Sequence, residues 1–172
     1  MQRIEDYLAR LYRYAFSLAR EEDIAKELVQ QGVLKALAAK TIPDDEPAYR
    51  AWLFVIVRNI FLDYQRNNRR NDLLFEEEQD DMPDMEYWQG EDRLINVLNV
   101  RQALGKLRTA DREVIGLVDM GGLSYAETSA VLDVPVGTVM SRISRARARL
   151  LALVEEKNVA TFARPRGSNR KY

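Results

Sequence analysis

The sequence predicts an all-α protein of two small helical domains joined by a flexible acidic linker, with a helix-turn-helix in the C-terminal domain. Three observations support this fold class. Apolar residues recur at helical spacing in several segments of the 172-residue chain. A strongly acidic segment without helical spacing separates two groups of these segments. Near the C-terminus, a capping signal and a proline mark two helices only a few residues apart.

The composition restricts the chemistry that this chain can perform. It contains neither cysteine nor histidine, which removes thiolate chemistry and the side chain that most often serves as general base or metal ligand. This does not exclude catalysis, but its usual apparatus is absent, so we expect neither an enzyme nor a metal site. No apolar run reaches the roughly 18 residues that a membrane span needs, and the N-terminus lacks the pattern of a signal peptide. These features predict a cytoplasmic protein without membrane insertion.

The formal net charge of −1 conceals a separation of charge along the chain. Nine acidic residues and no basic one lie between Glu76 and Asp92, whereas residues 134–172 hold nine basic and two acidic residues. Because local charge decides where a phosphate binds, the C-terminal part is the candidate for contact with nucleic acid.

The first domain is predicted over residues 1–72 and holds three helices. The first covers residues 1–20, on the spacing of Ile4, Leu8, Leu11, Ala15 and Leu18. The second covers residues 23–40, and a loop over residues 41–46 follows it. Pro47 opens the third helix, which is apolar on nearly all sides and is therefore expected at the centre of a bundle.

The third predicted helix ends in a run of amides and guanidinium groups, Gln65-Arg66-Asn67-Asn68-Arg69-Arg70. Amides offer hydrogen-bonding edges to unpaired bases, and guanidinium groups offer cations to phosphates. The run therefore suits single-stranded nucleic acid. The alternative is a frayed, solvated helix end, which six polar residues by themselves favour.

Residues 73–91 are the predicted linker, whose apolar residues could dock on a partner or hold the linker against one of its own domains. Residues 92–155 are predicted as a four-helix domain and residues 156–172 as a basic tail. The first helix of this domain is expected over residues 92–107. The second is expected over residues 110–120, capped by Thr109 and ended by Gly121 and Gly122.

The next two helices form the predicted helix-turn-helix. Ser124 and Glu127 make a capping box, so a helix begins at Tyr125. Residues 132–134 are short enough for the turn, and the recognition helix runs from Pro135 onward.

The outward side of the recognition helix is small in its middle and basic at its flanks. Ser141, Ser144 and Ala148 lie close together there, with arginines on both sides. Such a helix can enter a DNA major groove, where the arginines meet phosphate and the short side chains face base edges. The alternative is a surface helix whose arginines are only solubilising.

Three segments resemble the extracytoplasmic-function sigma factors of bacteria: LYRYAFSLAREEDIAKELVQQGVLKAL, YRAWLFVIVRNIFLDYQRNNRR and ADREVIGLVDMGGLSYAETSAVLDVPVGTVMSRISRARARL. The resemblance covers about residues 11–70 and 100–153. It implies a transcription initiation subunit that binds core RNA polymerase and promoter DNA and needs no cofactor. The first domain would hold the minus-ten element as a separated strand, and the second would read the minus-thirty-five element as duplex. Such proteins are commonly held inactive by an anti-sigma factor.

The resemblance also implies three sets of site residues. The minus-thirty-five set lies on the recognition helix and comprises Thr138, Met140, Ser141, Arg142, Ser144, Arg145, Arg147 and Arg149. The minus-ten set lies on the third helix and on a loop after it and comprises Asn59, Asp63, Tyr64, Asn67, Asn68, Arg69 and Arg70. The polymerase-binding set lies on the second helix and comprises Asp23, Glu27, Leu28, Gln30, Gln31 and Lys35. Met140 stands where many members carry lysine or arginine, so a contact to guanine is lost there or replaced by packing on a thymine methyl group.

Two other classes of function stay open on the sequence. A sigma-like mimic would occupy an anti-sigma factor without transcribing, but a mimic needs no phosphate-binding face, and the arginines of the recognition helix argue against it. An ordinary two-domain repressor or activator would bind duplex DNA alone. The residues from Asn67 to Arg70 and the long linker argue against that reading. An enzyme is a distant third.

Overall fold

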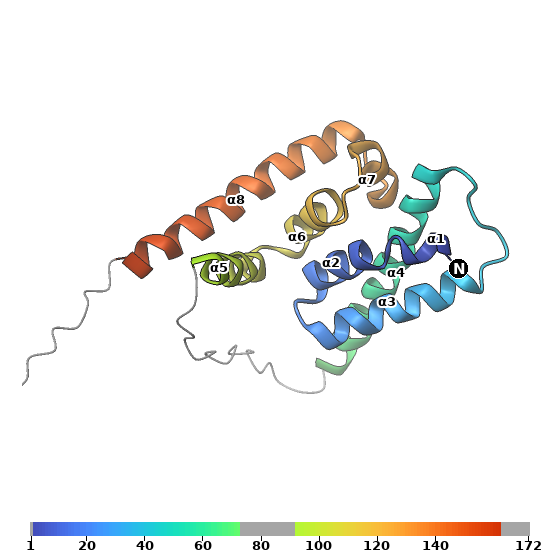
Figure 1. Ribbon diagram of the computed structural model, residues 1–172, viewed down its shortest axis with the longest axis horizontal. Helices are drawn as coiled ribbons and strands as arrows, with labels where there is room; N and C mark the ends of the chain where they lie inside the picture. The colour runs from blue at the N-terminus through green and yellow to red at the C-terminus, as the bar shows by residue number, and fades with distance from the viewer. Residues whose placement is uncertain (1, 73–91, 163–172) are drawn as a thin grey trace, which may run out of the picture.

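Figure 1 shows the computed structural model of this protein. The part of the chain that it describes is built from helices, as the sequence predicts. The structure describes residues 2–72 and 92–162, with side chains over residues 3–68 and 99–155. The predicted linker over residues 73–91 and the end of the predicted tail, residues 163–172, lie outside the described residues.

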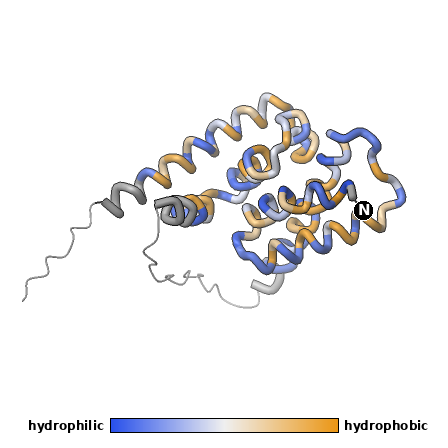
Figure 2. The backbone as a smooth tube through the Cα atoms, viewed as in Figure 1, coloured by the Kyte–Doolittle hydropathy of each residue, from blue (hydrophilic) through white to orange (hydrophobic). Residues whose placement is uncertain are grey.

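The N-terminal half contains four helices. They are α1 (Gln2–Glu5), α2 (Leu8–Ala19), α3 (Glu22–Leu37) and α4 (Glu46–Asp72). The helices α2, α3 and α4 pack on one another, and hydrophobic and hydrophilic residues alternate along them (Figure 2). The helices α2 and α3 therefore each bury one side, whereas α4 packs on α2, α3 and α7, in the central position that its apolar sequence predicts.

The prediction of one continuous helix over residues 1–20 is wrong, because the chain turns between α1 and α2. The ring of Tyr7 is 6.0 Å from that of Tyr49, and its hydroxyl group donates a hydrogen bond to Glu46. The guanidinium group of Arg3 also pairs with Glu46, at 2.9 Å. These contacts to the start of α4 hold the turn in place, and helical spacing alone carries no sign of them.

The C-terminal half contains four α-helices and one turn of π-helix. They are α5 (Asp92–Lys106), α6 (Thr109–Ile115), the π-helix η1 (Gly116–Met120), α7 (Tyr125–Leu132) and α8 (Val136–Phe162). In Figure 1, α8 runs along the upper edge of the molecule, on the side away from α3. It packs on α5, α6 and α7.

The predicted helix over residues 110–120 differs from the structure at its start and in its second half. The N-cap residue is Arg108, and the hydroxyl oxygen of Thr109 accepts a hydrogen bond from Arg112 (3.2 Å) instead of capping the helix. From Gly116 the helix widens to π geometry, where the Gly121 N–H donates to the Gly116 carbonyl (2.7 Å). Gly122 ends it with φ +67°, the left-handed conformation that the glycine pair predicts.

The capping box is confirmed in both directions. The Ser124 hydroxyl oxygen accepts from the Glu127 N–H (3.2 Å), and the Glu127 carboxylate accepts from the Ser124 N–H (2.8 Å). The same carboxylate pairs with Arg50 of α4 at 2.5 Å. Burial alone would raise the pKa of Glu127, but the hydrogen bonds from Ser124 and Arg50 outweigh it and hold that pKa below its ordinary value.

This carboxylate makes stability depend on pH. Because the pKa of Glu127 is lower in the folded chain, its contribution is fully present above the ordinary glutamate pKa and is lost as the pH falls through the lowered value. Glutamine can still cap the helix but loses the charge, so Glu127→Gln is expected to lower the free energy of unfolding by about 1–3 kcal/mol near neutral pH. The difference from the unmodified chain should shrink in acid. Urea titrations at several pH values measure it, with the exposed Glu155→Gln as control.

The last helix extends further than the sequence predicts. The sequence predicts a tail from residue 156, but α8 continues as a helix to Phe162. The boundaries of the predicted domains stay a prediction.

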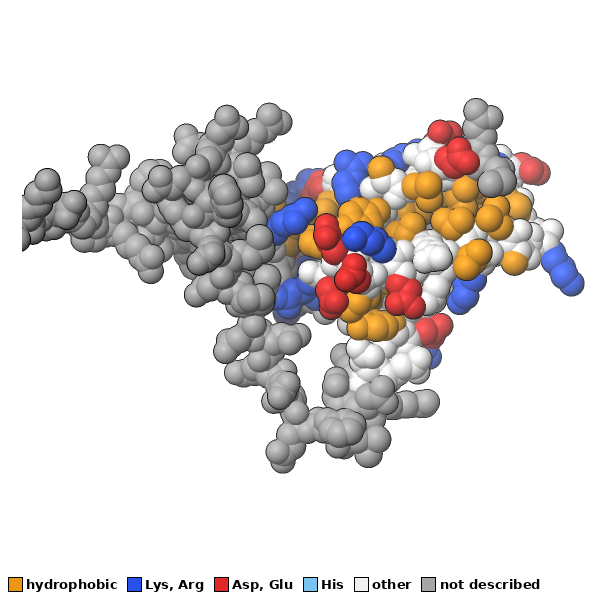
Figure 3. All heavy atoms as spheres, turned by 60° about the horizontal axis from the view of Figure 1, so that its bottom comes forward, with side chains coloured by type: hydrophobic (Ala, Val, Ile, Leu, Met, Phe, Trp, Pro, Cys, Tyr) orange, Lys and Arg blue, Asp and Glu red, His pale blue; other side chains and the backbone are white. Residues whose placement is uncertain are grey.

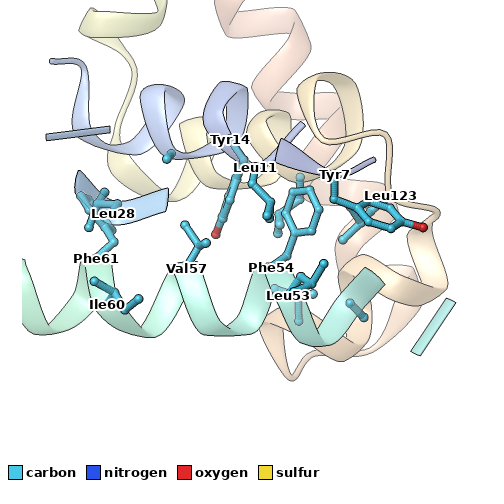
Figure 4. Close-up of a cluster of buried hydrophobic side chains, with 14 of the residues drawn as sticks. Tyr7, Leu11, Tyr14, Leu28, Leu53, Phe54, Val57, Ile60, Phe61 and Leu123 are labelled. Carbon is cyan, nitrogen blue, oxygen red and sulfur yellow. The ribbon is translucent and has the colours of Figure 1, made fainter. Parts of the chain in front are cut away.

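The two halves share a buried cluster in this structure. It joins Leu11 and Tyr14 of α2 and Phe54 of α4 to Leu117 of η1 and Leu123 beyond it, each 3% exposed or less. Figure 4 shows the labelled members of this cluster spread along α4, with Leu28, Ile60 and Phe61 at one end, Tyr14 and Phe54 in the middle, and Tyr7 and Leu123 at the other end. A second cluster lies within the C-terminal half and comprises Leu104, Leu107, Val114, Ile115, Val139, Ile143 and Ala146.

No helix in the described ranges combines the length and apolar character needed to cross a membrane. Among the same residues, no group of three or more acidic side chains is placed to hold a metal ion.

Candidate nucleic-acid interface

The turn between α7 and α8 has the short geometry of a helix-turn-helix. Asp133 follows α7 with φ 53°, a left-handed conformation that aspartate tolerates better than most residues. The Ser129 hydroxyl donates to the Val134 carbonyl (2.5 Å), and the Val134 N–H donates to the Ser129 carbonyl (3.2 Å). Both bonds tie the turn back to α7, so the direction of α8 is fixed at its first residue.

The recognition helix buries one side and exposes the other. Val139, Ile143 and Ala146 are at most 2% exposed and pack in the second cluster. The opposite side is exposed at four positions, Met140, Ser141, Ser144 and Ala148, while Thr138 is half-buried. The residues that the sequence predicts to face DNA bases therefore lie on the outer side of α8.

Two of the predicted DNA-binding arginines are engaged within the chain. Arg147 binds the Asp119 carboxylate through Nε (3.1 Å) and Nη2 (2.5 Å), and this hydrogen bonding raises the pKa of Arg147. Arg149 binds both carboxylate oxygens of the buried Asp111, at 2.9 and 2.7 Å. These pairs connect α8 to η1 and to α6. They brace the recognition helix against the rest of its half.

Arg142 and Arg145 differ from those two. Both are exposed, and neither forms an ion pair with any side chain in the described ranges. Arg145 Nε donates only to the Ser141 carbonyl of its own helix (3.2 Å). Their charges therefore stay available to a phosphate group.

Most of the predicted polymerase-binding residues lie on the surface of α3. Asp23, Glu27, Gln30, Gln31 and Lys35 are exposed. The exception is the sixth member, Leu28, which is 2% exposed and belongs to the shared core, so its place is inside the fold.

The predicted minus-ten residues lie on α4. Asn59, Asp63, Asn67 and Asn68 are exposed and Tyr64 is half-buried. The loop that the resemblance implies over Asn67 to Arg70 is wrong, because α4 continues as a helix to Asp72. The side chains of Arg69 and Arg70 lie outside the described ones.

A hollow of about 180 Å³ between α3 and α4 brings these two sets together. Its polar lining comprises Glu27, Gln31, Lys35, Asp63, Tyr64 and Asn67. Three of these residues belong to the polymerase-binding set and three to the minus-ten set. The two predicted functions therefore meet on one surface.

Exposed apolar residues also lie on α3 and in the loop after it. Leu34 and Leu37 on α3 and Ile42 in the following loop are 61%, 53% and 46% exposed. Figure 3 shows hydrophobic side chains gathered on one face, with acidic and basic side chains around them.

Several residues that shape the site carry no local sequence signal. Asp111 and Asp119 are 38 and 28 residues from the arginines that they bind. Asp111 lies in α6 and Asp119 in η1, so no helical spacing connects either one to the arginines of the recognition helix. A single sequence therefore cannot reveal that Arg147 and Arg149 are engaged.

The comparison with known proteins decides the family. Residues 3–71 match the family Sigma-70 region 2, and residues 98–150 match Sigma-70, region 4. The ECF RNA polymerase sigma factor EcfG of Rhodopseudomonas palustris (strain TIE-1) is 35% identical over 146 residues, which span 84% of this chain and 78% of EcfG. The chain belongs to the ECF sigma factor family. In this ECF sigma factor, α1 to α4 form region 2, and region 4 begins within α5 and extends into α8.

Solved structures agree with this assignment. The sigma factor RpoE from Bartonella quintana, in complex with the anti-sigma factor NepR, superposes with a TM-score of 0.76 at 30% identity and covers 90% of this chain and 95% of that one. CnrH in complex with the cytosolic domain of CnrY gives a TM-score of 0.65 at 30% identity, over 90% of this chain and 86% of that one.

Proposed function

We propose that this ECF sigma factor directs promoter-specific transcription initiation, with α8 reading the minus-thirty-five duplex and the α3–α4 surface engaging core polymerase and the minus-ten strand. One observation supports the duplex contact most strongly. The outer side of a helix-turn-helix recognition helix presents short side chains between two arginines that have no acidic partner among the described side chains.

On α8 the long charged side chains contact phosphates, and the short side chains contact bases. Arg142 and Arg145 bind phosphates and set the register of the helix on the duplex. Ser141 and Ser144 face base edges, to which a hydroxyl group can donate or accept. Met140, 52% exposed, packs on a thymine methyl group. Arg147 and Arg149 act as positioning residues, because their guanidinium groups are engaged by Asp119 and Asp111.

On α4 the exposed amides of Asn59, Asn67 and Asn68 offer hydrogen bonds to unpaired bases, and the ring of Tyr64 offers a stacking plane. The carboxylate of Asp63 pairs with Arg66 of the same helix at 2.5 Å, and its remaining acceptor capacity is directed to a base amino group. Arg69 and Arg70 supply cations for the strand backbone. The exposed polar residues of α3 bind core polymerase beside this strand.

The structures of RpoE with NepR and of CnrH with CnrY support a further partner. By similarity to these complexes, this chain binds an anti-sigma factor, which controls its access to polymerase.

The division among the arginines predicts how binding depends on salt. Each phosphate contact removes about one counterion from the duplex, so Arg142→Ala and Arg145→Ala should each reduce the slope of log affinity against log salt by about one. Arg147→Ala and Arg149→Ala should weaken binding without changing that slope. Fluorescence anisotropy of a labelled duplex, selected from a random library, measures the slope.

Asp119→Ala is the matched control for Arg147→Ala. If Arg147 braces the helix, removing either partner weakens duplex binding to a similar extent. If Arg147 binds phosphate instead, Asp119→Ala frees a cation and strengthens binding. That second result would remove Arg147 from the positioning residues.

A further inference from the structure

The two flanks of the exposed side of α8 differ in chemistry. Arg142 and Arg145 lie on one flank, where the proposed function places the phosphate contacts. Val136 and Met140 lie on the other flank, four residues and therefore about one helical turn apart. They are 41% and 52% exposed, so two apolar side chains stand next to each other on the surface of the recognition helix. This apolar flank has nothing with which to attract a phosphate.

A cation on the same flank is held by another element. Arg147 follows Met140 after seven residues, which is two helical turns. Its guanidinium group donates to the Asp119 carboxylate of η1 through Nε (3.1 Å) and Nη2 (2.5 Å). Because Asp119 engages this cation, the flank keeps its apolar character over the first two turns of the helix.

Gly137 leaves room beside the apolar pair. It is exposed, and it lies next to Val136 in the chain and three residues before Met140, on a neighbouring part of the helix surface. A Cβ atom added at Gly137 would meet no described atom within 4 Å outside the local helix backbone. Another molecule can therefore approach the helix closely here and reach both apolar side chains.

A DNA duplex offers one apolar group to a helix in its major groove, the C5-methyl group of thymine. In a helix-turn-helix, the N-terminal residues of the recognition helix contact the base edges. Val136 is the first residue of α8 and Met140 is the fifth. Both side chains thus belong to the part of the helix that lies nearest the bases, where a base that carries a methyl group fits an apolar flank.

We propose that Val136 and Met140 together form a methyl reader, which binds the 5-methyl group of a pyrimidine whether the base is thymine or 5-methylcytosine. The inference rests on the proposed function, in which α8 reads duplex DNA. Neither side chain carries a hydrogen-bond donor or a strong acceptor. They therefore respond to the methyl group at C5 and not to the carbonyl or amino group at C4, which distinguishes thymine from cytosine. Methylation of a cytosine at such a position makes a weak promoter site a better one.

The spacing of the pair determines where the two methyl groups lie. Residues four apart on a helix are about 6 Å apart along its axis. Successive bases of one strand are about 3.4 Å apart. The two methyl groups are thus expected within two base-pair steps of each other. Each is expected to change the affinity about fourfold, the effect of moving one methyl-sized group out of water.

Duplexes that differ by one methyl group test the proposal with the full chain. A duplex is first selected from a random library, and each of its thymines is then replaced by deoxyuridine, cytosine or 5-methylcytosine, with the matching purine opposite. Fluorescence anisotropy measures the affinities. At one or two positions, the thymine duplex should bind about fourfold more tightly than the deoxyuridine duplex. At the same positions, the 5-methylcytosine duplex should bind about fourfold more tightly than the cytosine duplex.

Substitutions at the two exposed positions assign the effect to the side chains. Val136→Ala and Met140→Ala should each bring both affinity ratios to about one at a single position and leave the other position unchanged. Met140→Leu keeps an apolar side chain and should keep its ratios. Leu151→Ala is the matched control, because Leu151 is 59% exposed on the same flank, three turns further along α8, and it should leave every ratio unchanged.

The possible results separate this inference from the proposed function. A selected duplex that binds equally well with thymine and with deoxyuridine at every position overturns the methyl reader and assigns the apolar pair to a protein contact, while α8 still reads duplex DNA. Wild-type ratios in the double variant Val136→Ala with Met140→Ala also overturn it, as does a methyl effect on thymine without one on cytosine. If the library yields no bound duplex, the duplex contact of the proposed function fails, and the methyl reader fails with it.

Discussion

Replacing Asn67, Asn68, Arg69 and Arg70 together by alanine is expected to abolish open-complex formation on a duplex promoter. Opening base pairs and unstacking a base costs a few kcal/mol. In the proposed function, the amides and cations at the end of α4 offset that cost, and they do so only once the strands separate. Binding to the minus-thirty-five duplex should stay nearly intact, because α8 is unchanged.

Because these four residues lie within the helix α4, their replacement by alanine should remove the polar groups without disturbing the backbone. Alanine is the strongest helix former, so the four replacements keep the helix while removing its polar groups. Permanganate reactivity of unpaired thymines measures the opening, with run-off yield as a second readout. A template whose minus-ten region is already mismatched should recover part of the activity, since its strands are separated in advance.

The matched control changes Arg13 of α2 and Glu155 of α8 to alanine; both residues are exposed, and neither belongs to a predicted set or to the α3–α4 surface. It should melt the promoter as the wild type does. Normal permanganate reactivity in the fourfold alanine variant would exclude these residues from strand opening.

Leu117→Ala is expected to cause a large loss of stability. Its side chain is fully buried at the contact of region 4 with α2 and α4. Truncating a buried leucine costs about 2–5 kcal/mol, from the lost burial and from the cavity that remains. This is a large share of the about 5–15 kcal/mol that stabilises a typical domain.

Urea unfolding followed by circular dichroism measures the loss. Leu151→Ala is the control with the same chemistry, because Leu151 is 59% exposed on α8 and should change the free energy of unfolding by less than about 0.5 kcal/mol. Equal effects of the two substitutions would contradict the shared core.

The elements that the sequence predicts correctly are those with local signals. The capping box at Ser124 and Glu127 and the left-handed glycine at position 122 follow from residues within one turn of each other. The apolar spacing of Val139, Ile143 and Ala146 likewise gives the buried side of the recognition helix. In each case the chemistry that decides the structure lies in the segment itself.

The features that the sequence misses depend on distant contacts. The break at Tyr7 is set by Glu46 and Tyr49, and the π-helix at Gly116 lies where α2 approaches. Predicting either one requires knowing how the helices pack.

The candidate site divides in the same way. Exposure of Ser141, Ser144 and Arg145 follows from helical spacing. The engagement of Arg147 by Asp119, and the burial of Leu28, follow from packing between elements. A resemblance assigns roles by position, and only the three-dimensional contacts show which side chains are free to fill them.

Run-off transcription with purified core RNA polymerase tests the central claim most directly. The template is a library of promoters with random minus-thirty-five and minus-ten elements, and the readout is the sequence of the transcripts that form. We predict transcripts from a defined pair of elements with the unmodified chain, and their loss when Arg142 and Arg145 are both alanine. Absence of transcripts from every promoter, including those with a mismatched minus-ten region, would contradict a sigma factor and favour a mimic that only occupies an anti-sigma factor.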